Sequence, residues 1–299
     1  TAVSGNQEGI FGYGKTGGQT TVATTNLVSN AGVVASDTAG VGQDRQKPAA
    51  CEYGGDKGIF GYGTAVISSI TTHLSMTNLV TNAGVVGDDV AGVGQARPAL
   101  GACSYGEDKG IFAYGESFIS PWVYGMSNLV SNVGVVAADV AAVGTLRQQL
   151  AACEYGDDKG IFGFGYTGGL AATAITNLVS NVGVIAADTA GVGTAGNGPA
   201  ACSYDGDKGI FGFGYRGGYA GMTNLVSNVG VVATDVAAVG TVRAWLAACE
   251  YGGDKGIFGY GWTGSAVSMS NLVSNAGVVA SDVTGVGTAR GYNGACSFN

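Results

Sequence analysis

Charge, proline and histidine are all scarce in this chain of 299 residues. It holds 13 lysines and arginines against 21 aspartates and glutamates, with 4 prolines and 1 histidine. The small basic content argues against a nucleic-acid-binding protein, which needs a basic stripe to contact phosphates. Because there is so little proline and no strict Gly-X-Y period, the chain is not collagen.

Long apolar runs are also missing. Gly, Asn, Ser, Thr or Asp interrupts each apolar run within a few positions, whereas a spanning helix needs about 20 consecutive apolar residues. We therefore expect no membrane insertion. The N-terminus shows neither an initiating Met nor the segments of a signal peptide. Either a leader was removed or the chain is a fragment of a longer protein.

What the chain does have is glycine and a repeat. It contains 56 glycines and 46% apolar residues, so it can bury a core, but so much Gly, Val and Thr disfavours helices. Three blocks recur six times in the same order, beginning with Gly-Ile-Phe-Gly-Tyr-Gly at 9–14, Asn-Leu-Val-Ser-Asn at 26–30 and Ala-Cys-Glu-Tyr at 50–53. The cysteines of the third block are Cys51, Cys103, Cys153, Cys202, Cys249 and Cys296.

Each unit of about 50 residues predicts four short strands, at 49–53, 57–63, 75–81 and 85–93 in the second unit. Repeated four-stranded units of this period are typical of a β-propeller. A linear solenoid is the competing interpretation, but it would need polar capping repeats, and the sequence shows none.

The two ends of the sequence favour a closed ring. The chain opens on a second-strand block and closes on a lone first-strand block at 295–299. We therefore predict an all-β fold: one six-bladed β-propeller of four-stranded antiparallel blades, closed by pairing of strand 295–299 with the N-terminal strands. The predicted blades are 291–299 with 1–45, 46–97, 98–147, 148–196, 197–243 and 244–290.

The order of these features resembles Kelch-type propellers. The match consists of a hydrophobic strand, a short Gly/Asp turn, an aromatic-glycine strand, a variable loop and an arginine before the next first strand. That arginine recurs at Arg45, Arg97, Arg147, Arg243 and Arg290. The chain departs from the family in lacking its double glycine after strand two and its strand-four Trp. The repeats also resemble uncharacterised propeller proteins of aquatic bacteriophages and bacteria.

One face of the predicted propeller varies between blades, while the other is nearly constant. A rigid frame with one variable face is typical of a binding surface, and aromatic residues and Arg dominate interface energetics. Ordinary variable loops are the alternative interpretation. The candidate ligand-binding residues are His73, Phe118, Trp122, Tyr124, Tyr166, Tyr215, Arg216, Tyr219 and Trp262.

The cysteines and a repeated aspartate are expected to be structural. One cysteine per blade leaves no pair within a blade, so we expect small buried side chains rather than disulfides. The aspartate is expected to fix a turn or bulge, or to pair with Arg between blades; calcium would need more converging oxygens. With one histidine and no Cys-x-x-Cys, no metal site is predicted. The aspartates are Asp37, Asp89, Asp139, Asp188, Asp235 and Asp282.

No catalytic motif stands out, so we predict a protein that is not an enzyme and uses no cofactor. The favoured function is an extracellular or virion-surface binding or structural module, such as an adhesion, receptor-binding or decoration domain. Its expected partners are other proteins of a surface assembly or a cell-surface glycan. A multivalent carbohydrate-binding lectin is the alternative, and a propeller glycosidase or lyase is less favoured.

Overall fold

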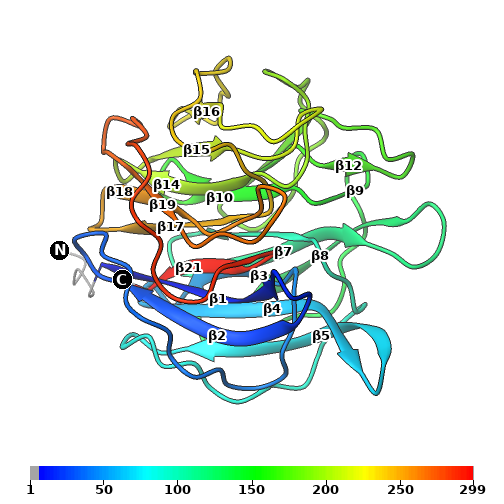
Figure 1. Ribbon diagram of the computed structural model, residues 1–299. Coiled ribbons are helices and arrows are strands. Elements are labelled where there is room, and N and C mark those ends of the chain that lie inside the picture. Colours follow the sequence, from blue (N-terminus) through cyan, green and yellow to red (C-terminus); the bar gives the residue numbers. More distant parts are fainter. Residues whose placement is uncertain (1–6, 299) are drawn as a thin grey trace.

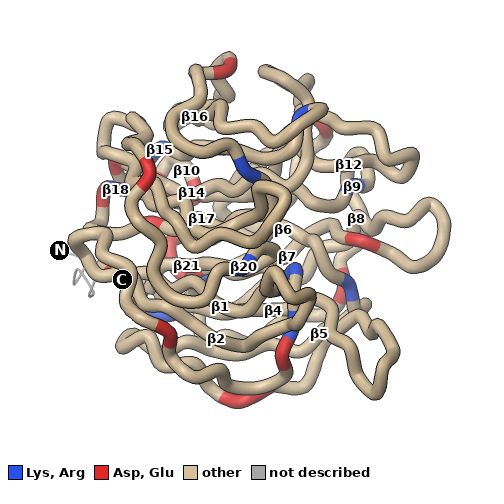
Figure 2. The backbone as a smooth tube through the Cα atoms, in the orientation of Figure 1, with Lys and Arg blue, Asp and Glu red and all other residues tan. Residues whose placement is uncertain are grey.

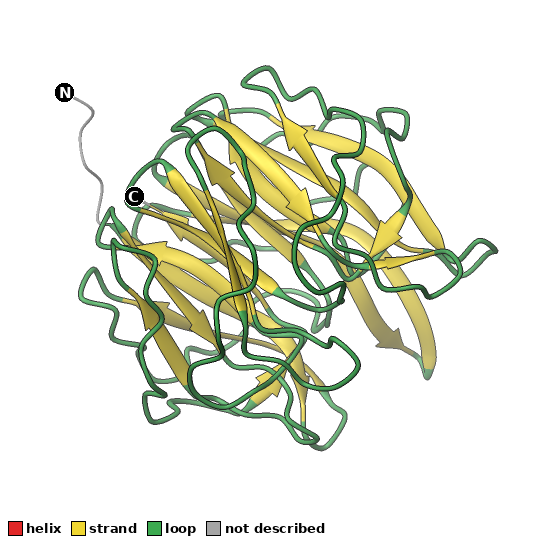
Figure 3. Ribbon diagram, turned by 90° about the horizontal axis from the view of Figure 1, so that it is seen from above, coloured by secondary structure: helices red, strands yellow, loops and turns green. Residues whose placement is uncertain are grey.

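Repeated antiparallel sheets make up the fold, and the computed structural model describes residues 7–298. Within that range the chain forms strands, turns and loops, and no helix (Figure 3). The described residues therefore contain no helix that is long and apolar enough to cross a membrane. In five sheets the strands follow one another in chain order. These are β3 (Ala49–Tyr53), β4 (Lys57–Ile67), β5 (Ile70–Val80); β6 (Gly101–Tyr105), β7 (Lys109–Glu116), β8 (Val123–Val130); β10 (Ala151–Tyr155), β11 (Lys159–Gly163), β13 (Thr176–Val179); β14 (Ala200–Tyr204), β15 (Lys208–Gly212), β16 (Thr223–Val226); and β17 (Ala247–Tyr251), β18 (Lys255–Gly259), β19 (Ser270–Val273).

The sixth sheet joins the two ends of the chain. β21 (Gly294–Phe298) pairs antiparallel with β1 (Glu8–Thr16), so that Cys296 lies opposite Ile10, and β1 pairs in turn with β2 (Thr21–Val28). Figure 1 shows the red β21 beside the blue β1. The prediction that the C-terminal strand pairs with the N-terminal strand is confirmed, although Asn299 lies outside the described residues. Two short strands, β9 (Arg147–Gln148) and β20 (Arg290–Gly291), pair with β12 (Tyr166–Thr167) and β1.

The predicted fourth strand of each unit is not a continuous strand. In the second unit, the segment expected at 85–93 joins β5 only through isolated bridges at Val86 and Val90. Between them the Asn78 side-chain amide donates to the Gly87 carbonyl at 3.0 Å. The side chain thus takes an acceptor that a regular ladder would pair with backbone N–H. Apart from β20 and the two-stranded pair of β9 and β12, the sheets are three-stranded with a bridged outer segment.

Close contact between glycine and cysteine brings neighbouring sheets together. A Cβ on Gly58 would lie 2.5 Å from Cys296 Sγ, a distance too short for any other residue type, so glycine is required there for packing. The six cysteines are free and buried. The same contact recurs at Gly110–Cys51, Gly160–Cys103, Gly209–Cys153, Gly256–Cys202 and Gly9–Cys249.

The first strands of the six sheets form a series of neighbours that returns to its start. β21 contacts β3, β3 contacts β6, β6 contacts β10, β10 contacts β14, β14 contacts β17, and β17 contacts β21. Each hydrophobic cluster accordingly combines residues of adjacent sheets; one, for example, holds Cys51 of β3 with Ala102 of β6 and Phe112 of β7. The core is therefore distributed between sheets.

The repeated aspartates join neighbouring units. Asp37 accepts hydrogen bonds from the Asn26 amide at 2.9 Å and from the Thr288 hydroxyl at 2.6 Å, and Arg290 Nη1 lies 4.0 Å away. Partial burial raises the pKa of Asp37, but these hydrogen bonds outweigh it and the net pKa is lowered. One carboxylate thus accepts the hydrogen bonds that fix the turn and also lies beside an arginine. Asn and backbone partners recur at Asp89, Asp139, Asp188, Asp235 and Asp282.

Candidate ligand-binding site

Six residues, one from each unit, form a closed ring of backbone hydrogen bonds. Each lies just before a first strand, and its N–H donates to the carbonyl of the ring residue in the neighbouring unit at 2.7–3.1 Å. The last bond, from the Lys47 N–H to the Tyr292 carbonyl, completes the circuit. The backbone ring, as we call it, consists of Lys47, Ala99, Gln149, Gly198, Trp245 and Tyr292.

All members of the backbone ring adopt positive φ, between 53° and 61°. Glycine takes this conformation freely, whereas other residues are strained in it. Only one of the six positions, Gly198, is occupied by glycine. Strained backbone is concentrated at functional sites. The side chains of Lys, Gln, Trp and Tyr at these fixed backbone positions are therefore candidates for function.

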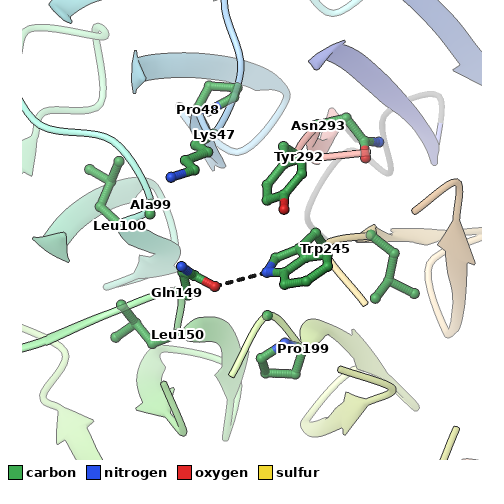
Figure 4. Close-up of a pocket in the computed structure, with 12 residues that line it drawn as sticks. Lys47, Pro48, Ala99, Leu100, Gln149, Leu150, Pro199, Trp245, Tyr292 and Asn293 are labelled. Atoms are coloured by element: carbon green, nitrogen blue, oxygen red, sulfur yellow. Dashed lines mark hydrogen bonds between the residues drawn. The ribbon is translucent and has the colours of Figure 1, made fainter. Parts of the chain in front are cut away.

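The ring side chains surround a shallow hollow open to solvent, with a cavity volume of about 100 Å³, smaller than the usual range of about 300–1,000 Å³ for pockets that enclose a drug-sized ligand. Trp245 and Tyr292 stack with ring centroids 5.0 Å apart. The Trp245 indole N–H donates to Gln149 Oε1 at 2.8 Å, across the position of Gly198. Figure 4 shows the Tyr292 hydroxyl, the Gln149 amide and Trp245 facing the middle of the hollow.

One charged pair lies at the edge of the hollow. Lys47 Nζ donates to Glu116 Oε2 at 2.5 Å and lies 5.9 Å from the centroid of the Tyr292 ring. Burial raises the pKa of Tyr292 to about 12, so its hydroxyl remains protonated at neutral pH. The hollow therefore combines two aromatic faces with amide, ammonium and hydroxyl donors.

Three of the predicted ligand-binding residues extend this aromatic surface. Tyr215 stacks near Trp245 with centroids 6.2 Å apart, Tyr219 stands at 90° to the Trp245 ring, and Trp262 lies 6.3 Å from Tyr292. All three are half-buried. We call Tyr215, Tyr219, Trp245, Trp262 and Tyr292 the aromatic arc.

Five predicted residues lie outside the aromatic arc. His73 and Phe118 stack on each other with ring centroids 3.5 Å apart. Burial lowers the pKa of His73 to about 4. Trp122 is exposed, and its carbonyl accepts from the Gln148 side chain at 3.3 Å. The remaining two, Tyr124 in β8 and Tyr166 in β12, are half-buried.

The structure assigns the remaining predicted residue, Arg216, a different place from the one expected. Its side chain is 2% exposed, donates to Asn224 and Asp235 at 3.0 Å, and lies over the Phe164 ring. Arg97 makes the equivalent contacts with Asn128 and Asp139 of the following unit and with the Tyr62 ring. Arg216 thus fills the position left empty by Gly196, where the recurrent arginine is missing, and its side chain is buried rather than displayed on the variable face.

A second ring lies further along the first strands. Three glutamates alternate with three serines around a hollow that all six first strands line. Burial raises the pKa of Glu52 to about 7 and the pKa values of Glu154 and Glu250 to about 8, and repulsion among the carboxylates adds to the effect. The acid–serine ring consists of Glu52, Ser104, Glu154, Ser203, Glu250 and Ser297.

Stability should fall as pH rises through the range in which these glutamates ionise. Their folded pKa values exceed the ordinary value of 4.5, so between pH about 4.5 and 8 the folded state holds more protons than the unfolded state. The E52Q/E154Q/E250Q variant should be about 2–4 kcal/mol more stable than wild type at pH 8.5, because the opening of the hollow to solvent reduces the full cost of about 1.4 kcal/mol per pKa unit.

Urea unfolding between pH 4 and 9 measures this effect. The exposed Glu107 provides the control, since E107Q should keep the wild-type pH profile. A triple variant whose stability declines with pH as steeply as wild type would refute the assignment.

The sequence interpretation missed Lys47, Gln149, Trp245 and Tyr292. A signal was present, because each backbone-ring residue stands two positions after the recurrent arginine or after Gly196, and its type differs in every unit. Among residues 7–298, no cluster of three or more His, Cys, Asp or Glu side chains could hold a metal ion. No known family model and no curated protein matches the chain.

Proposed function

We propose that the six sheets form one six-bladed β-propeller with a Kelch-like arrangement. Three closed circuits support it: the contacts among first strands, the hydrogen bonds of the backbone ring, and the aspartate contacts that run from Thr288 back to Asp37. Each circuit counts six members and uses every unit once. On this proposal the backbone ring surrounds one end of the propeller axis and the acid–serine ring lies nearer the other.

This propeller is proposed to act as a non-enzymatic binding module at an extracellular or virion surface, in adhesion, receptor binding or decoration. The observation that carries the proposal is the backbone ring, where a fixed and strained backbone displays a different side chain in each unit. Variation of the side chain at a position whose backbone is rigid supports a role in ligand recognition. Glu116 is paired with Lys47 and His73 is stacked on Phe118, which supports binding rather than acid–base catalysis there.

A multivalent lectin is the second candidate that the sequence suggested. It would need equivalent pockets in most units. The aromatic arc instead draws its members from 215 to 292 alone, and the ring positions on the other side hold Lys47, Ala99 and Gln149. The geometry therefore favours one site at the axis over several sites between blades.

Binding to intact cells tests the proposed module. Fluorescently labelled full chain would be incubated with a panel of fixed bacterial cells, and retained fluorescence would be measured by flow cytometry. Wild type should label at least one cell type, and the variant K47A/Q149A/W245A/Y292A should lose that labelling because the hollow is stripped of its side chains.

A variant on the opposite side of each unit serves as the matched control. Val85 and Val184 lie in exposed hairpin turns, so V85S/V184S should label cells as wild type does. Absence of labelling by wild type, or full labelling by the ring variant, would contradict the proposed function.

A further inference from the structure

We infer that the hollow takes one pyranose ring of a glycan, packed against the stacked pair of Trp245 and Tyr292 and hydrogen-bonded by Gln149 and Lys47. The inference rests on the proposed binding module and adds the class, number and placement of its ligand. It depends on four features of the hollow: its aromatic walls, its donors, its asymmetry and its rigidity.

The aromatic walls suit a ring with an apolar face. Trp245 and Tyr292 are half-buried and stack on each other with an interplanar angle of 20°, so their facing planes are covered and a ligand meets the remaining faces and edges of the pair. Indole and phenol rings combine a large apolar body with a polar tip. A pyranose carries C–H groups on its faces and hydroxyls around its edge, and this division matches aromatic planes bordered by polar groups.

The donors lie where such hydroxyls would point. Gln149 Oε1 already accepts from Trp245 and from Asn197 at 2.8 and 2.7 Å, so its Nε2 is left to donate. Lys47 Nζ donates to Glu116, and an ammonium group has further donors available. Since Glu116 offsets the Lys47 charge, the site does not call for an anionic ligand, and hydroxyl oxygens are suitable acceptors.

The asymmetry of the backbone ring limits the ligand to one ring per chain. Large side chains from Trp245 and Tyr292 occupy one part of the circuit, with the Trp245 indole lying over Gly198, whereas Ala99 contributes only a methyl group elsewhere. Only the sector beside Trp245 also has Tyr215 and Tyr219. No second sector of the ring, over residues 7–298, combines stacked aromatic walls with an amide.

The rigidity of the site reduces the cost of binding. The backbone of each ring residue is fixed by hydrogen bonds on both sides, and the Trp245 indole is held by Gln149. A ligand then orders little of the protein when it binds, which leaves more of the contact free energy for affinity.

A glycan array followed by titration calorimetry tests the inference. The array identifies a free oligosaccharide that wild type binds, and calorimetry with that compound should give one bound ligand per chain. W245A should weaken the affinity about tenfold or more, as expected for a central aromatic contact, and W245F should recover part of it. W122A, which removes an exposed Trp outside the aromatic arc, should bind as wild type.

Treated cells separate this inference from the proposed module. Periodate, which destroys cell-surface glycans, should abolish ring-dependent labelling, whereas protease treatment should preserve it. Labelling that survives periodate but not protease would overturn the glycan assignment and leave the binding module standing. A stoichiometry near six, or a W245A variant that folds and binds normally, would overturn the single-site inference. If wild type labels no cell at all, the proposed function itself fails.

Discussion

A chain that ends at residue 293 should lose cooperative folding altogether. The deletion removes β21, which pairs with β1 and contacts β17 and β3. It also removes Phe298 and Cys296, which are 0% and 4% exposed. Loss of a buried Phe side chain alone costs about 3–5 kcal/mol. Without β21, the faces of β17 and β3 that contact it and the edge of β1 that pairs with it are also exposed. The total approaches the whole stability of a typical domain, about 5–15 kcal/mol.

Circular dichroism during heating measures the loss, and a circular permutant supplies the control. Joining Asn299 to Thr1 and opening the chain at Gly55, a turn position with open space around it, keeps β21 in the protein. The permutant should unfold cooperatively at a temperature close to that of wild type. If the truncated chain kept the wild-type transition, closure through β21 would have no energetic importance.

Replacement of Arg216 by alanine should cost about 3 kcal/mol, the low end for breaking a buried ion pair, because Asp235 keeps partial contact with water. The substitution leaves Asn224 Oδ1 and the Thr194 carbonyl without their arginine donor and uncovers the Phe164 ring. At this chain length the loss corresponds to a drop in Tm of roughly 6–10 °C. Differential scanning calorimetry measures it.

The substitution G196R, alone and combined with R216A, tests whether positions 196 and 216 share one arginine site. G196R alone should also destabilise, since a Cβ at Gly196 would lie 2.5 Å from Arg216 Cγ. In the double variant G196R/R216A, the new arginine takes the position equivalent to that of Arg97, which contacts Asn128 and Asp139 of the following unit. Its Tm should recover most of the loss of R216A. Additive losses in the double variant would show that the two positions do not share one arginine site.

The regular part of the fold could be predicted from the repeat. The strand expected at 49–53 coincides with β3, and the meeting of the two chain ends was expected from the separated sequence blocks. The prediction of a fourth strand was wrong because the apolar residues of that segment suggested a regular ladder. In the structure, the Asn78 side chain donates to the Gly87 carbonyl in place of a backbone N–H. The alternation of apolar and polar residues does not reveal where a side chain replaces the hydrogen bonds of the backbone.

The candidate site was predicted only in part. Tyr215, Tyr219 and Trp262 were found because aromatic residues in a variable loop are visible as composition. Trp245 and Tyr292 were missed because their importance depends on positive φ and a hydrogen-bond circuit, which no residue type signals by itself. Arg216 was misplaced because its role depends on the absence of another arginine 20 residues earlier, at Gly196.

The alternation of glutamate and serine along the inner strands has a consequence for how such a chain can grow or shrink. Removing or duplicating a single unit would bring two glutamates, or two serines, onto adjacent first strands. Two neighbouring buried carboxylates would repel each other without a hydroxyl between them. Gain or loss of units in pairs would preserve the alternation of glutamate and serine around this ring. Figure 2 shows how sparsely the other charged residues are spread along the chain.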